Sequence, residues 1–415
     1  TPIQHWFFEQ RLPNPHHFNL VLTLESLEPL DAAGLEAAMH QLVAHHDALQ
    51  LRYREEASGW VQESVGPGKA VSFTCTDLSA LSAPEQEAAM AQQAAALNAR
   101  LHLSTGPLVA LTLFTRGAGQ GSRVLIAVHH LVMDAVSCHI LLADLQTAYA
   151  QLGRGEAIAL PPKTTAFGQW AQQLVEHAQS DALGVEVDHW CAPSWSQASP
   201  LPVDFPEGVN SVASARQLST SLGSEETRAL LQEVPKAYNT QINDVLLTAL
   251  AQALASWTGA RAHSIALEGH GREPILEGVD RSRTVGWFTT LYPVRLDLAA
   301  AAGPAEALKA IKEQVRQIPT GGIGYGLLRY LRDDQDTRAR LQTLPQPEVS
   351  FTYLGQLDQS LPGDSPFGLK SFGLSGSASG ERRHHLLDIN GLVIGGCLQM
   401  AWVYSEQVHR ASTID

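Results

Sequence analysis

The chain is poor in cysteine and in basic residues, and it has no long apolar run. Its four cysteines are scattered and include no CxxC pair, which argues against a disulfide scaffold and a zinc site and favours a reducing cytoplasm. The 28 lysines and arginines are outnumbered by 42 acidic residues, for a formal net charge of -14, which argues against a nucleic-acid partner. The chain shows neither an unbroken apolar span nor a signal peptide, so we expect no membrane segment.

The chain does contain enough apolar material for large cores, with 44% hydrophobic and 17% charged residues in a length of 415. This length predicts two or more structural units. Because the chain starts at Thr1 without methionine, we expect it to be a segment of a longer polypeptide.

Strand and helix patterns alternate along both halves of the chain, which predicts an α/β (α+β) fold. The expected helices are 32–48, 84–98, a segment after Asp134, 242–257 and 304–318, and the expected strands are 49–54, 108–115, 123–129, 263–268, 347–353 and 391–404. Residues 192–213, rich in Ser, Pro and Val, predict a loop-rich connection. If two similar lobes pack side by side, a ligand site between them is expected.

The first candidate site follows a predicted strand of five apolar residues, 124–128. This strand runs into His129 and His130, and Asp134 comes four residues after the second histidine. An imidazole at the end of a buried strand, beside a carboxylate, suits a general base. Three other His-His pairs occur in the chain, so the pair alone is equally compatible with core or solvated imidazoles.

The second candidate site lies 138 residues further on, where an apolar run ends at Glu268. Gly269 and Gly271 flank His270, so the backbone can turn sharply after Glu268 and approach a ligand closely. Taken alone, the segment also fits an ordinary strand-to-loop turn. It has no GxGxxG fingerprint, and the glycines at 321–326 are followed by no GKS/T, so we expect no nucleotide site.

Seven motifs that occur in order resemble the condensation-domain superfamily of nonribosomal peptide synthetases, and its epimerization branch in particular. The first is the His-His-x-x-x-Asp-x-x-Ser pattern of residues 129–137. The EGHGRE sequence at 268–273 matches the epimerization branch. The other five are residues 2–9, 243–250, 283–293, 322–330 and 351–356.

The resemblance implies two chloramphenicol-acetyltransferase-like lobes that form a V-shaped pseudo-dimer with a central tunnel. The N-terminal lobe would be residues 1–175, and the C-terminal lobe would be residues 176–415, including the segments that bridge to the first lobe. The substrate would be an aminoacyl or peptidyl thioester on the 4′-phosphopantetheine arm of an upstream peptidyl carrier domain in the same polypeptide. The reaction would invert the Cα, usually from L to D. A downstream condensation domain, no cofactor of its own, no metal, a monomeric excised domain and a cytoplasmic location are also expected.

Inversion requires that one proton leaves the Cα and another arrives on the opposite face. Two titratable groups on separate lobes meet this requirement, so Glu268 and His130 are the predicted catalytic residues. Which of them deprotonates the L isomer stays open at this point. A second role also stays open for His130, in which a protonated imidazole stabilises the enolate oxygen.

Supporting roles are predicted for the neighbours of these two residues. We expect His129 to hold the end of the strand, and Asp134 to orient the loop through Arg272 or Arg283. By the resemblance, Arg272 and Tyr353 would line the site; Tyr353 would hydrogen-bond the thioester region or simply pack in its strand. Ser137 lacks a GxSxG elbow, so we interpret it as a helix-start residue.

Three residues depart from the usual motifs of the epimerization branch. Ala135 and Cys138 stand where Gly and Trp are common, and Thr352 stands where Asn is expected. A hydroxyl is shorter than an amide and offers fewer hydrogen bonds. These changes keep open a catalytically silent condensation-like domain that recruits a carrier or partner enzyme. An amide-bond-forming condensation domain also stays open, because it would share the motif from His129 to Asp134.

Overall fold

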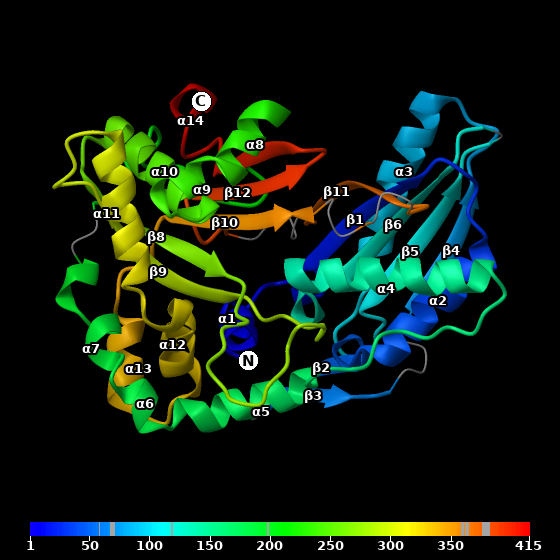
Figure 1. Ribbon diagram of the computed structural model, residues 1–415, viewed down its shortest axis with the longest axis horizontal. Helices are drawn as coiled ribbons and strands as arrows, with labels where there is room; N and C mark the ends of the chain where they lie inside the picture. The colour runs from blue at the N-terminus through cyan, green and yellow to red at the C-terminus, as the bar shows by residue number, and fades with distance from the viewer. Residues whose placement is uncertain are drawn as a thin grey trace.

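The computed structural model describes residues 1–57, 59–66, 71–117, 119–196, 199–357, 361, 365–375 and 382–415. It consists of two lobes that lie side by side, each built on one β-sheet (Figure 1). A separate two-stranded ribbon, β2 (Leu51–Glu56) with β3 (Gly59–Ser64), follows the first helices. Within these described ranges, no helix has both the length and the apolar character needed to cross a bilayer.

The first sheet is buried on both faces along its central strands. Its order is β11-β1-β6-β5-β4. In β6, Val124, Ile126 and Val128 point into the main core, whereas Leu125 and Ala127 point into a smaller cluster on the other face. The strands are β1 (Asn19–Ser26), β4 (Val71–Asp77), β5 (Val109–Thr115), β6 (Ser122–His129) and β11 (Gly368–Leu374).

Three helices cover this sheet. α2 (Ala32–His45) packs against α4 (Ala135–Gly153) on one face, and α3 (Ala83–Asn98) covers the other (Figure 1). α3 begins where the sequence predicts, because Ser82 and Glu85 form a capping box: the Ser82 backbone N–H donates to the Glu85 carboxylate at 2.8 Å.

The second sheet has the order β7-β13-β12-β10-β8-β9. β10 pairs in parallel with both β8 and β12, and the other pairs are antiparallel. The strands are β7 (Ala215–Ser221), β8 (Ala262–Gly269), β9 (Thr290–Asp297), β10 (Val349–Gln356), β12 (Leu387–Ile394) and β13 (Cys397–Ser405).

Most of the remaining helices lie in the second lobe. Helix α10 (Ile242–Thr258) packs on β8 and β9 and against α11 (Pro304–Arg316). This packing buries the α10 residues Leu247, Leu250 and Leu254. The helices are α1 (Pro2–Glu9), α5 (Phe167–Ala178), α6 (Asp181–Gly184), α7 (Val187–Trp190), α8 (Ser224–Gln232), α9 (Val234–Tyr238), α10 (Ile242–Thr258), α11 (Pro304–Arg316), α12 (Ile323–Gly326), α13 (Gln335–Gln342) and α14 (Ala411–Ile414).

Three features join the two lobes. β11 leaves the second half of the chain and pairs antiparallel with β1 of the first sheet, as Figure 1 shows. In the opposite direction, α1 packs against β9 and the helical turn of residues 327–331 in the second lobe. The third feature is α5 (Phe167–Ala178), a continuous helix that contains the predicted division at residue 175. The larger hydrophobic core accordingly contains residues of both lobes.

The predicted helices and most predicted strands are confirmed within a few residues. The segment 391–404, predicted as one strand, is a correction: it contains parts of two strands, β12 and β13, which turn at Gly395 and Gly396 with φ of +61° and +72°. Six strands were not predicted: β1, β3, β4, β7, β9 and β11. β9 contains Pro293 and lies at an edge of its sheet, where proline is tolerated. Between 192 and 213, the described residues form loops with a short 3₁₀ turn and an isolated bridge between Ser211 and Arg382, as expected for a loop-rich connection.

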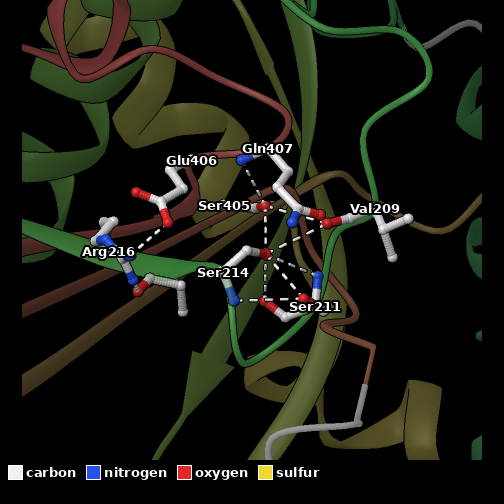
Figure 2. Close-up of polar contacts among 8 residues, drawn as sticks. Val209, Ser211, Ser214, Arg216, Ser405, Glu406 and Gln407 are labelled. Carbon is white, nitrogen blue, oxygen red and sulfur yellow. Dashed lines mark hydrogen bonds and ion pairs between the residues drawn. The ribbon is translucent and has the colours of Figure 1, made fainter.

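A cluster of serines holds the two outer strands β7 and β13 together (Figure 2). The Ser214 Oγ lies 2.7 Å from the Ser405 Oγ and 2.9 Å from the Ser211 Oγ. Ser405 also donates to the Val209 carbonyl at 3.2 Å. The hydroxyls satisfy one another and the backbone, so the cluster is a structural link between the chain before β7 and the end of β13.

Candidate active site

His130 begins the 3₁₀ turn His130–Val132 at the end of β6. Its ring contacts two aromatic rings that also contact each other, with centroids 5.3 Å from Phe18 and 4.4 Å from Trp287. Its backbone N–H donates to the Phe18 carbonyl at 2.9 Å. Burial lowers the pKa of His130 to about 4, so the imidazole is neutral at pH 7 and is able to accept a proton.

Both ring nitrogens of His129 form hydrogen bonds with backbone groups. Its Nδ1 accepts from the Leu131 N–H at 3.2 Å, and its Nε2 therefore carries the hydrogen that is donated to the Pro15 carbonyl at 2.8 Å. Burial lowers the pKa of His129 to about 3. These contacts favour the structural role that the sequence predicts for this residue.

Asp134 caps α4 and ties the first lobe to the loop that precedes β9. One carboxylate oxygen accepts from the Ser137 N–H at 2.7 Å, and the other accepts from the Phe288 N–H at 3.0 Å. Of its two predicted partners, Arg272 is the one in contact, at 3.4 Å. Arg283 pairs with Asp144 instead.

Arg272 is held by groups of both lobes. Its guanidinium donates to the Arg281 and Thr284 carbonyls, both at 2.8 Å, and to the Ser137 Oγ at 3.1 Å. It also lies 3.9 Å from the centre of the Phe288 ring. These contacts make Arg272 a positioning group between the lobes rather than a free donor that faces a substrate.

Ser137 acts as a second link between the lobes. Its hydroxyl donates to the Gly286 carbonyl at 2.8 Å and accepts from the Gly286 N–H at 3.1 Å. A Cβ at Gly286 would lie 2.2 Å from the Phe167 ring, so only glycine fits there. α4 starts at Ala135, and Ser137 is a first-turn residue as predicted.

Glu268 lies near the end of β8, beside Leu291 of β9. Burial raises the pKa of Glu268 to about 7, and the negative charge of Asp388 adds to this rise, although a hydrogen bond with Thr352 opposes it. The turn after Glu268 packs closely against the next segment. Gly271 has φ of +67°, and a Cβ there would lie 1.6 Å from the Phe288 carbonyl oxygen.

The neighbours of Glu268 in the sheet include groups that sequence reasoning missed. Asp388 of β12 accepts from the Ser350 hydroxyl and from Arg383, both at 2.5 Å. The signal that could have identified Asp388 was the alternation of buried and half-buried residues along β12. Tyr353 follows Thr352 in β10, so its side chain points to the opposite face, where it lies near Gly391. The structure therefore does not bring Tyr353 to Glu268.

His130 and Glu268 lie near the two ends of one short segment. Trp287 contacts His130, and Leu291 is the cross-strand neighbour of Glu268. The four-residue step from Trp287 to Leu291 spans at most about 14 Å between Cα atoms. An imidazole from the first lobe and a carboxyl group from the second thus adjoin the two ends of this segment.

The described residues contain no group of three histidine, cysteine or acidic side chains that could hold a metal ion. All four cysteines are free.

Comparison with known proteins relates the whole chain to one family. A family model for the condensation domain matches residues 1–415. A component of the linear gramicidin synthase from Brevibacillus parabrevis is 46% identical, and the match covers 100% of this chain and 5% of that protein. Gramicidin S synthase 1 from Brevibacillus brevis is 38% identical, with coverage of 100% and 38%. The chain thus spans a minor part of these relatives.

Solved structures give the same result. The epimerization domain from the third module of tyrocidine synthetase B superposes with a TM-score of 0.93 at 36% identity, covering 100% of this chain and 92% of that one. The X-domain from teicoplanin biosynthesis has a TM-score of 0.72 at 18% identity, which shows a shared fold alone. The predicted two-lobed fold and the predicted resemblance to epimerization domains are confirmed, and the chain belongs to the condensation-domain family.

Proposed function

We propose that the chain inverts the Cα of an aminoacyl or peptidyl thioester, from L to D, during nonribosomal peptide synthesis. The observation that carries this proposal is the buried Glu268, whose pKa is raised to about 7. Its cross-strand neighbour Leu291 lies four residues along the chain from Trp287, which contacts the His130 imidazole of the other lobe. A general acid or base works best when its pKa lies near the working pH. The 36% identity to an epimerization domain along the full chain supports the same function.

The proton states of the two groups match one direction of the reaction. Near pH 7 His130 is neutral, and Glu268 is about half protonated, so the protonated acid is available. His130 would take the Cα proton as the C–H bond breaks, and the electron pair would move into the thioester carbonyl to form an enolate. Glu268 would then give its proton to the opposite face. The reverse direction uses the Glu268 carboxylate and the His130 imidazolium.

The neutral state of His130 weighs against the alternative in which a protonated imidazole stabilises the enolate. Among the supporting residues, Thr352 would orient the carboxyl group of Glu268, since the two are hydrogen-bonded. His129, Asp134 and Arg272 would hold the loops that carry the two catalytic groups.

The substrate would arrive on the 4′-phosphopantetheine arm of a peptidyl carrier domain, through a tunnel between the lobes. The chain covers only 5% and 38% of two relatives. This supports an upstream carrier domain and a downstream condensation domain in one polypeptide. No cofactor of its own is proposed for the chain, and the excised domain is proposed to be a cytoplasmic monomer.

Solvent exchange tests this function directly. A carrier domain loaded with an L-aminoacyl group is mixed with the protein in deuterated buffer, and the released amino acid is analysed by mass and by chirality. Deuterium at Cα and D product support the proposal. Amide formation with an added acceptor would identify a condensation domain. The absence of both products would identify a silent recruitment domain.

A further inference from the structure

A pocket of about 300 Å³ lies next to the candidate site, between α1, β9 and α12. Its lining includes Trp6 of α1 and Leu291 of β9. Neither His130 nor Glu268 lines it, so it extends beyond the point where the reaction is proposed to occur.

The inner end of the pocket is next to both proposed catalytic groups. Directly opposed residues of an antiparallel pair point to the same face, so the Leu291 side chain lies beside that of Glu268. On the other side, Trp6 contacts Trp287 with ring centroids 6.3 Å apart, and Trp287 contacts His130. A molecule that reacts between His130 and Glu268 could therefore continue into this pocket.

The outer end of the pocket reaches the surface. Gln342, Gln346 and His384 line the pocket and are all solvent-exposed. A pocket that is open at its far end places no limit on the length of what enters it. This differs from a closed pocket, which would measure a single side chain.

The wall of the pocket offers polar groups that suit amides. One oxygen of Glu9 accepts from the Arg329 guanidinium at 3.1 Å and from the Tyr330 hydroxyl at 2.8 Å. The Arg329 Nε is buried and has no hydrogen-bond partner among the described residues. Buried polar atoms are normally hydrogen-bonded, so an unpaired donor in a residue that lines a cavity is available to water or to a polar ligand.

We propose that this pocket holds the peptide chain that precedes the inverted residue, so that the substrate is a peptidyl thioester rather than a single aminoacyl thioester. The inference rests on the proposed function and specifies its substrate class. A peptide carbonyl would accept from the unpaired Arg329 Nε, and apolar parts of the peptide would contact Trp6 and Leu291. Residues further upstream would leave past Gln342 and Gln346.

The test compares two carriers that end in the same residue, one loaded with that residue alone and the other with a tripeptide. We expect kcat/KM for D product to be at least roughly tenfold higher with the tripeptide, because remote contacts contribute binding energy to the transition state. Gln346→Trp, which fills the mouth of the pocket, should lower the tripeptide value by about tenfold and leave the aminoacyl value within about twofold. Gln335→Trp, an exposed position on α13 outside the pocket, is the control and should change neither value.

Equal turnover of the two carriers, or equal slowing of both by Gln346→Trp, would overturn the inference and leave the proposed function standing. Inversion of neither carrier by the unmodified protein would overturn the proposed function as well. Circular dichroism and thermal melting of the two tryptophan variants check that both remain folded.

Discussion

Thr352 of β10 is hydrogen-bonded to the Glu268 carboxyl group at the end of the neighbouring strand β8. Burial favours the protonated form of Glu268 and is the larger effect, whereas this hydrogen bond favours the ionised form. Together they leave the pKa of Glu268 at about 7. The carboxyl group can therefore both give and take a proton near neutral pH.

Replacement of Glu268 by glutamine removes the proposed acid and keeps the shape of the side chain. Glu268→Gln should lower the formation of D product by about 10²–10⁴-fold, measured by chiral analysis of the released product. Circular dichroism should show an intact fold. The matched control is Glu277→Gln at an exposed loop position, which should retain full activity. Unchanged inversion by Glu268→Gln would exclude this residue as the acid.

The raised pKa of Glu268 also predicts a pH dependence of stability. Between the ordinary value of 4.5 and about 7, the folded chain keeps a proton that the unfolded chain releases. The free energy of unfolding should therefore fall across this window, by up to about 3 kcal/mol, and the loss is complete above it. Urea unfolding of the wild type and Glu268→Gln at pH 5 and pH 8 isolates this contribution. A stability difference between the two proteins that is the same at both pH values would contradict it.

The two pKa values also define the pH profile of kcat/KM. Below about pH 4 His130 is protonated and cannot accept the Cα proton, and above about pH 7 Glu268 has lost the proton that it donates. The profile should be bell-shaped, with limbs near these two values. Initial rates of inversion from pH 4 to pH 9 provide the measurement. A rate that still rises above pH 8 would require a different acid–base pair.

Thr352 sets the upper limb of that profile. Thr352→Val removes the hydroxyl that favours ionised Glu268, so the upper limb should move to higher pH by about one unit. Thr352→Asn keeps a hydrogen-bond donor and should leave the limb near its original position. If the valine variant instead lowers the maximal rate without a shift of the limb, Thr352 contacts the substrate rather than Glu268.

Arg272 is predicted to stabilise the fold through the buried carboxylate of Asp134. Arg272→Met should lower the free energy of unfolding by about 3 kcal/mol or more, because it leaves that charge unpaired. Arg54, whose side chain is 50% exposed in its ion pair with Glu56, is the matched control, and Arg54→Met should cost less than about 1 kcal/mol. Chemical denaturation of both variants compares the two, and similar losses would argue against the role given to Arg272.

The sequence predicts the parts of the site that depend on local order. Apolar runs that end in His130 and Glu268 indicate β6 and β8, and the spacing to Asp134 indicates the start of α4. Partners that come from distant strands could not be derived in this way. Arg272 and Arg283 were equivalent candidates until the turn at Gly271 placed one of them against Asp134.

The contact between Thr352 and Glu268 depends on the strand order β10-β8, which local pattern does not reveal. The two strands are 80 residues apart and parallel, so neither a hairpin turn nor a short spacing links them. The same reason explains why Asp388 was missed. Its role depends on a neighbouring strand and on Ser350 rather than on its own sequence context.

The position of β11 constrains any exchange of lobes between relatives. Its backbone completes one edge of the first sheet, although it is encoded more than 200 residues after the other strands of that sheet. A chimera cut only once, near the middle of the chain, would pair β1 of one parent with a foreign edge strand from the other. Recombinant swaps should therefore carry residues 368–374 together with the N-terminal half, as a two-crossover exchange.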